Sequence, residues 1–233
     1  ALNAYVNQHG QATLAAAEAS RENGNSPNTV VSGAVAIVGK KMVEPAMEAA
    51  KALLSLFQFA KFSDPVSSYD YKEELQSAKS HKSSLLLNSD DACADKMASC
   101  LGQGAQSIFI KFLLDFAKRE GGKPSTDAMI AAIWITLGWS GLRSKKITRG
   151  TIARLPWYSR IYSTIVGVVA SADKHSEDSF CGVKVEELIK GFSFTRTAFL
   201  SLMGREPSDD ELFEFQVLLG LIITNGPGTI SAQ

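Results

Sequence analysis

The sequence predicts an α+β fold that is mostly α, in which a small N-terminal α/β region leads into a helical domain. The clearest helix signal covers residues 208–223, where apolar side chains at helical spacing follow a capping sequence. The clearest strand signal is the β-branched apolar run 30–38, which Gly39 closes. Between residues 30 and 112 we expect the order strand, helix, helix, strand, helix, which suggests a small α/β layer.

The first 62 residues are predicted to form two helices, one on either side of that strand. An alanine-rich segment favours a helix over residues 12–21, and the polar residues 23–28 are expected to form a loop. The second helix is expected over residues 41–62, because its apolar side chains share one broad face. Pro45 falls in the first turn of this expected helix, where a missing N–H is tolerated.

The next fifty residues contain only short patterns that predict secondary structure. A charged helix is expected at about residues 68–80, after the Ser-Asp-Pro punctuation that precedes it. The apolar run 85–87 is interpreted as a second strand, and the acidic residues that follow start a helix that ends at about residue 101. Residues 107–112 fit a strand and a helix equally well.

A capped helix and a basic connector precede the predicted domain boundary. Ser125 caps a helix over residues 126–138, and the apolar stripe of this helix predicts a core position. The connector, residues 138–154, gathers five basic side chains: Arg143, Lys145, Lys146, Arg149 and Arg154. It is interpreted as a solvated loop or as an anion site that a phosphate-rich ligand such as coenzyme A would favour. We place the boundary at about residue 150, between residues 1–150, which have no assigned role, and residues 151–233.

The last helix is predicted to be buried. Ser208 and Glu211 have capping-box spacing, and two aspartates place negative charge at the positive end of the helix. The side chains that follow are apolar nearly all round, and a helix of that kind belongs inside a core. The helix is expected to break at residues 224–228, where two glycines allow the backbone to approach a ligand closely.

Several short motifs follow one another through the last third of the chain. They are Phe180-Cys181-Gly182-Val183, then Val185-Glu186-Glu187-Leu188, then the helix end at residues 199–204, then Gly226-Pro227-Gly228 with Ser231. Their order and spacing resemble the citrate synthase superfamily, which includes citryl-CoA lyases and the lyase module of ATP-citrate lyase. Residues 163–167 stand near the strand that begins such modules. The resemblance therefore implies that residues 151–233 form the first part of a helical citrate synthase-like domain.

The family joins or cleaves a carbon–carbon bond between an acyl-CoA and a 2-oxo acid. The resemblance implies that Asn225, Gly226, Gly228 and Ser231 bind substrate, that a coenzyme A thioester is a substrate, and that no cofactor is bound permanently. In the lyase-type turn a substrate-binding histidine stands immediately before Gly-Pro, where this chain has Asn225. An amide donates a hydrogen bond but carries no charge. Asn225 therefore marks a changed substrate or a lost activity, or it simply tolerates the left-handed turn.

No catalytic residue is assigned, because the second histidine and the aspartate of the family lie beyond this turn and the sequence ends at Gln233. Enolate chemistry needs such an acid–base pair. His9, His81 and His175 stand in polar sequence outside the matching motifs and are predicted to be surface residues. The resemblance therefore implies an incomplete portion of an enzyme that is not active alone.

The composition of the chain narrows the classes of function and the compartments that remain possible. The 24 basic and 24 acidic residues balance, so no net field favours nucleic acid or an anionic membrane. The three cysteines form no C-x-x-C pair, which is typical of a reducing compartment, and no His/Cys cluster has metal-ligand spacing. No secretory signal is visible, and the longest uncharged run, residues 128–142, is shorter than the roughly 20 residues that span a bilayer. We expect a cytoplasmic protein.

Three functions remain open at this point. The first is a portion of a citrate synthase-like or citryl-CoA lyase-like enzyme that acts as a homo-oligomer or with a complementing C-terminal chain. The second is a catalytically inactive homologue that serves as a structural or regulatory subunit, and Asn225 favours it. The third is a coenzyme A or anion-binding module independent of the family, which rests only on the basic connector.

Overall fold

A computed structural model describes residues 2–87, 92–104 and 107–223, and it confirms a mostly helical α+β fold. The chain is 71% helical, and the sheet in the described part has two strands. The elements are η1 (Leu2–Tyr5), α1 (Ala12–Glu22), α2 (Pro27–Ala36), α3 (Lys40–Leu56), α4 (Lys72–Ser77), η2 (Ala78–His81), α5 (Lys82–Leu85), α6 (Ala92–Gly104), α7 (Ile108–Arg119), α8 (Thr126–Arg143), α9 (Arg149–Val169), η3 (Ala172–Lys174), β1 (Ser179–Phe180), β2 (Val183–Lys184), α10 (Val185–Gly191), α11 (Phe194–Met203) and α12 (Asp209–Ile223).

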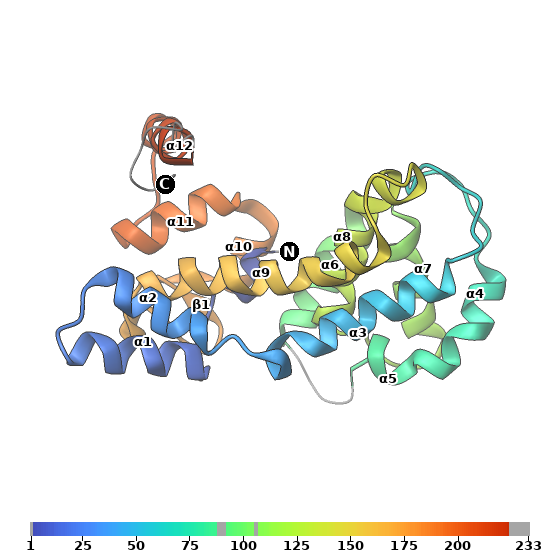
Figure 1. Cartoon of the computed structure of the whole chain (residues 1–233), viewed down its shortest axis with the longest axis horizontal. Coiled ribbons are helices and arrows are strands. Elements are labelled where there is room, and N and C mark those ends of the chain that lie inside the picture. The colour runs from blue at the N-terminus through green and yellow to red at the C-terminus, as the bar shows by residue number, and fades with distance from the viewer. Residues whose placement is uncertain (1, 88–91, 105–106, 224–233) are drawn as a thin grey trace.

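Helix α9 lies along the long axis of the molecule and connects its two ends (Figure 1). Its first half packs against α3 and α8, where Ile152 and Ala153 join the largest apolar core. Its second half packs against α1 and α2, where Val168 contacts Val30 and Ala34. The predicted domain boundary at residue 150 falls on the second residue of this helix.

The largest core lies among α3, α7 and α8 and is rich in aromatic rings. The Phe109 ring lies edge-on to Phe57 at 5.0 Å and to Trp139 at 4.9 Å, between ring centroids. The Trp139 indole also donates a hydrogen bond to the Phe62 carbonyl at 3.1 Å. Aromatic pairs in these geometries add stability beyond the apolar area that they bury.

The N-terminal segment closes the fold against residues far along the sequence. The Asn3 amide nitrogen donates to the carbonyl oxygens of Leu188 and Phe192, at 2.7 and 2.8 Å. Nearby, the backbone of Val6 passes so close to Gly167 that a Cβ there would overlap the Val6 carbonyl oxygen. Gly167 is therefore the position where α9 permits this close approach.

The strand predictions in the N-terminal region are wrong. Residues 30–38 lie mostly in α2, which begins with Pro27 in its first turn and buries Val30 and Ala34 at helical spacing. Residues 85–87 end α5, and the only strand-like feature there is an isolated bridge between Leu86 and Pro124. Residues 163–167 lie inside α9. Short apolar runs do not separate strand from helix by periodicity, and here packing against neighbouring helices decided.

Several helix boundaries also differ from expectation. Residues 107–112, which fitted a strand and a helix equally well, form the start of helix α7, with Ser107 as its N-cap. Helix α3 ends at Leu56, so it is shorter than predicted, and Pro45 lies inside it beyond the first turn. The connector 138–154 is mostly helical, because α8 continues to Arg143 and α9 begins at Arg149.

The sheet is a hairpin that the sequence analysis did not predict. Phe180 pairs with Val183 and Ser179 with Lys184, and the two residues between the strands, Cys181 and Gly182, both have positive φ. That combination is a type I′ turn, which matches the twist of paired strands. The pair Cys181-Gly182, between the apolar residues Phe180 and Val183, is the feature of the sequence that could have predicted this turn.

Candidate functional site

The four predicted substrate-binding residues, Asn225, Gly226, Gly228 and Ser231, lie outside the described residues. The structure does describe α12, the helix that leads to them. The predicted capping box is confirmed at its start, where Glu211 N–H donates to Ser208 Oγ at 3.2 Å and Ser208 N–H donates to Glu211 Oε2 at 2.9 Å. Arg205 also donates to both Glu211 oxygens, and its guanidinium lowers the pKa of Glu211 to about 2. The start of α12 is thus held firmly.

The predicted burial of α12 is wrong. Its apolar side chains Phe213, Val217 and Leu218 are 67, 47 and 50% exposed, and no residue in 209–220 is buried. The helix lies outermost in the molecule and packs on α11, with the Phe215 ring edge-on to Phe199 at 5.5 Å (Figure 1). The apolar periodicity was correct, but the described part of the chain supplies a neighbour for one side of the helix only.

The exposed apolar side chains continue onto α11. Leu202 and Met203, at the end of that helix, are 57 and 58% exposed. We call these residues together with Phe213, Val217 and Leu218 the α11–α12 patch. Exposed apolar surface marks interaction sites in folded proteins where it forms a large patch. The sequence analysis missed Leu202 and Met203, although they precede Gly204, which ends α11 in the left-handed conformation.

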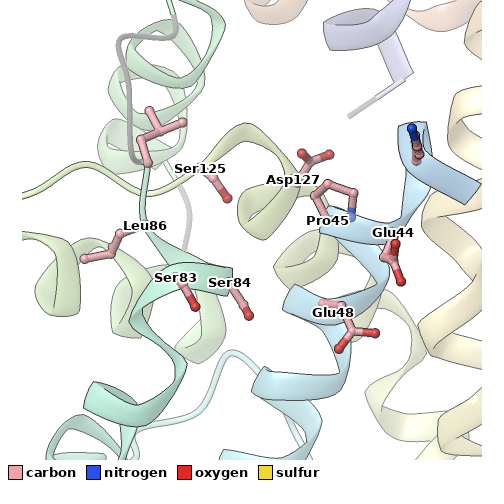
Figure 2. Close-up of a pocket in the computed structure, with 10 residues that line it drawn as sticks. Glu44, Pro45, Glu48, Ser83, Ser84, Leu86, Ser125 and Asp127 are labelled. Atoms are coloured by element: carbon pink, nitrogen blue, oxygen red, sulfur yellow. The ribbon is translucent and has the colours of Figure 1, made fainter.

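The pocket drawn in Figure 2 lies where α3, α5 and the start of α8 meet, and it has a volume of about 510 Å³. Its polar lining combines carboxylates and one lysine with hydroxyls: Glu44, Glu48, Asp127, Lys41, Ser83, Ser84 and Ser125. Each carboxylate already has a partner. Lys40 lies 3.2 Å from Glu44, Lys51 lies 2.6 Å from Glu48, and the Tyr5 hydroxyl donates to Asp127.

Because the carboxylates of this pocket are already paired, they are poorly placed to act as catalytic acids or bases. Burial, followed by the negative charge of Asp127, raises the pKa of Tyr5 well above its usual value, so this phenol acts as a donor only. The Arg160 guanidinium lies over the Tyr5 ring at 3.6 Å and completes the arrangement. Within the described residues no group of three metal-ligating side chains occurs, here or elsewhere. The pocket is therefore a polar surface feature whose carboxylates are already paired, and Lys41 adds a cation to its lining.

The histidines and cysteines do not form a catalytic group either. His175 is buried, which corrects the prediction of a surface residue, whereas His9 is exposed and His81 half-buried. Cys93 and Cys100 share α6, as their spacing indicated, and all three cysteines are free thiols. Burial raises the pKa of the Cys181 thiol to about 11 and raises that of Cys100. Both thiols are protonated at neutral pH and are poor nucleophiles.

The five basic residues of the predicted connector are spread over the end of α8, the loop and the start of α9. The Arg143 guanidinium lies over the Trp139 ring at 6.0 Å, and Lys145 occupies a left-handed turn with φ of 60°. Arg154 faces a different surface, a pocket between α3 and α9 that also contains Trp157. The connector is thus neither a simple solvated loop nor one basic cluster.

Comparison of the chain with protein-family models, with curated proteins and with solved structures found no match. In the described part of the chain, no helix is long and apolar enough to cross a membrane.

Proposed function

We propose that this chain is a citrate synthase-like or citryl-CoA lyase-like protein that acts on an acyl-CoA and a 2-oxo acid, and that it does so as an assembly. The observation that carries this proposal is α12, an apolar helix that is firmly capped and that the described residues cover on one side only. In the sequence it leads directly to the segment Asn225–Ser231. A helix of this kind is stable when a second surface covers it. The motifs of the resemblance lie on β1, β2, α10 and α11, and the last motif falls in the segment that follows α12 in the sequence.

The occupant that we propose for the α11–α12 patch is a second copy of the chain. Phe213, Val217 and Gly220 follow one another at helical spacing, and no atom of another described element lies within 4 Å of the Cβ position of Gly220. In an antiparallel pair of α12 helices, Phe213 of each copy lies near Gly220 of the other. A large side chain then meets a small one at two symmetric places, as a two-fold interface requires.

Charge favours the same arrangement. The first turns of α12 carry Asp209, Asp210 and Glu211, and the helix has no basic residue in its last turn. A parallel pair would place two acidic turns side by side, whereas an antiparallel pair places them at opposite ends and opposes the helix dipoles.

In this proposal the residues after α12 bind substrate. Asn225 donates its amide hydrogen bond to the carbonyl or carboxylate of the oxo acid, while Gly226 and Gly228 let the backbone approach. Ser231 contributes a hydroxyl. The acid and base at the acyl carbon come from outside the described residues, and none is assigned here.

Assembly is tested with the double variant Phe213→Glu, Val217→Glu, compared with Phe59→Glu. Phe59 is 84% exposed and lies between α3 and α4, away from the patch, so it is a matched change of an exposed apolar residue. In sedimentation equilibrium we expect the wild type and Phe59→Glu to be oligomers and the double variant to be a monomer. A monomeric wild type would exclude the second copy, and if the double variant stayed oligomeric the interface would lie elsewhere.

Substrate binding is tested by titration calorimetry with acetyl-CoA and with oxaloacetate, for the wild type and Asn225→Ala. We expect both ligands to bind and Asn225→Ala to weaken oxaloacetate by at least about tenfold, because one hydrogen bond to a charged group contributes about 1.5–3 kcal/mol. Binding of the coenzyme A ester alone would support an anion-binding module instead.

The second candidate is a catalytically inactive homologue with a structural or regulatory role. It is supported by Asn225, which stands where the lyase-type turn has histidine. It is also supported by His175, the one buried histidine among the described residues. Burial lowers the pKa of His175, and both of its ring nitrogens already contact backbone groups. An oligomeric wild type that binds neither ligand would favour this candidate.

A further inference from the structure

A pocket of about 500 Å³ lies between α3 and α9 and is lined by Met47, Arg154, Trp157, Tyr158 and Ile161. We propose that it binds a planar aromatic anion, with the ring against Trp157 and Tyr158 and the anionic group on Arg154. This inference does not depend on the proposed function. It concerns a different part of the molecule from α12 and the residues that follow it.

Arg154 is a cation without a protein partner. It is exposed, and within the described residues it makes no ion pair, hydrogen bond or ring contact. Arg21, Arg196 and Arg205, by contrast, each pair with a glutamate. A guanidinium presents a planar fork of donors that fits a carboxylate or phosphate bidentately and also stacks on aromatic rings.

Trp157 differs from the other two tryptophans in the same way. The indole N–H groups of Trp134 and Trp139 donate to Ser159 Oγ at 2.5 Å and to the Phe62 carbonyl at 3.1 Å. The described part of the chain offers no such acceptor to Trp157, and neither Trp157 nor Tyr158 stacks on another ring there. Two unpartnered donors and two free aromatic faces therefore line one pocket.

The spacing along α9 explains this grouping. Arg154, Tyr158 and Ile161 follow at steps of four and three, and Trp157 lies three residues after Arg154, so all four share one side of the helix. Met47 contributes a polarisable thioether from α3, which packs well against aromatic rings.

The charge of the lining selects the ligand. Among the described residues that line this pocket, Arg154 is the only charged one. Glu44 and Glu48, which lie close to Met47 in the sequence of α3, line the other pocket and are paired with Lys40 and Lys51. A volume of about 500 Å³ fits a ligand with one or two rings and an acidic group. Nucleotides and aromatic carboxylates share this chemistry, so the test separates them.

The test is titration calorimetry of the full chain with AMP, indole-3-carboxylate, adenosine and inorganic phosphate. We expect at least one of the two aromatic anions to bind at least about tenfold more tightly than adenosine or phosphate, because only an aromatic anion uses both the rings and Arg154. AMP alone would identify the nucleotide, and indole-3-carboxylate alone the aromatic acid. No binding by either, or equal binding by adenosine, would overturn the proposal.

Variants locate the site. Arg154→Gln and Trp157→Leu are each expected to weaken the anion by about tenfold or more, with an unchanged Tm that shows the fold is intact. Arg149→Gln is the matched control, because Arg149 is an exposed arginine on the same helix that does not line this pocket. An equal loss in Arg149→Gln would indicate general attraction to basic charge and overturn the assignment. A change of oligomeric state in Trp157→Leu would show that a second copy covers this surface, and would also overturn it.

Discussion

His175 shows how one side chain can connect three segments that are distant in sequence. Its Nδ1 accepts a hydrogen bond from the Gln8 N–H at 3.1 Å, and its Nε2 lies 3.1 Å from the Gly167 carbonyl oxygen, to which it donates. The ring also packs on Phe180 of the hairpin, with 4.9 Å between centroids. A neutral imidazole with the proton on Nε2 satisfies these two backbone contacts, and Asn7 Oδ1 also lies 3.1 Å from Nδ1.

This arrangement predicts that stability falls in mild acid. Burial lowers the pKa of His175 in the folded protein below the value of about 6.5 that it has when unfolded. The unfolded chain therefore takes up a proton more readily, so the contribution is complete above about pH 6.5 and is lost as pH falls below it. In urea unfolding between about pH 7.5 and pH 5.5, we expect the free energy of unfolding to decrease for the wild type.

The variant His175→Gln removes the titrating group and should flatten that pH dependence, although it also lowers stability at all pH values. His81→Gln, at the end of η2 and not among the groups that act on the pKa of His175, is the control and should keep the wild-type slope. Equal slopes for all three proteins would mean that His175 does not titrate differently on folding.

At the scale of the element, capping residues were the most reliable signals. Ser125 precedes α8 and accepts a hydrogen bond from the Ala128 N–H at 3.0 Å, as its position in the sequence predicted. Ser208 does the same for α12 within a capping box. These interactions depend on residues three apart, so they form wherever the helix forms.

The Ser125 cap predicts a defined loss of stability. Ser125→Ala leaves an N–H of the first turn of α8 without its acceptor and should lower the free energy of unfolding by about 1 kcal/mol. Ser83→Ala is the matched control, because Ser83 lines the same pocket but makes no hydrogen bond with the described residues. Urea unfolding measures both changes, and a control as destabilised as Ser125→Ala would assign the loss to the pocket wall instead of the cap.

At the scale of the whole molecule, α9 connects a large aromatic core at one end to smaller apolar clusters at the other (Figure 1). The larger core contains the fully buried rings Phe57, Phe109 and Phe112. Because interiors are densely packed, the loss of one ring there leaves a cavity that neighbours fill only in part.

Phe109→Ala is therefore expected to lower the free energy of unfolding by about 3–5 kcal/mol. Phe59→Ala, the same change at a ring that is 84% exposed, should leave it nearly unchanged. Chemical denaturation followed by circular dichroism measures both variants. Similar losses in the two would contradict the placement of the core among α3, α7 and α8.

Much of the helical content could be predicted from the sequence, and the errors have a common origin. The helices at 12–21 and 126–138 and the cap at Ser208 were recognised because periodicity and capping are local. The strand at 30–38 was wrong because a β-branched run of that length is compatible with either state until its neighbours are known. Gly182 and its positive φ were missed because the hairpin is short.

The candidate site was predictable only in part. The resemblance pointed to residues after α12, and the structure shows how that helix is capped and oriented, but the exposure of Phe213 and Val217 could not be predicted. Arg154 was assigned to the basic connector and Trp157 to no predicted site, and they share one pocket because both belong to α9.

The sequence by itself determined where most helices lie and how they begin, because those properties depend on residues within one or two turns of each other. Only the tertiary structure decided which apolar faces are covered, that His175 is buried, and that Met47 meets Arg154 and Trp157 across two helices. The physical reason is that burial and electrostatic environment are set by contacts between distant segments. The same apolar stripe is a core in α7 and an exposed surface in α12.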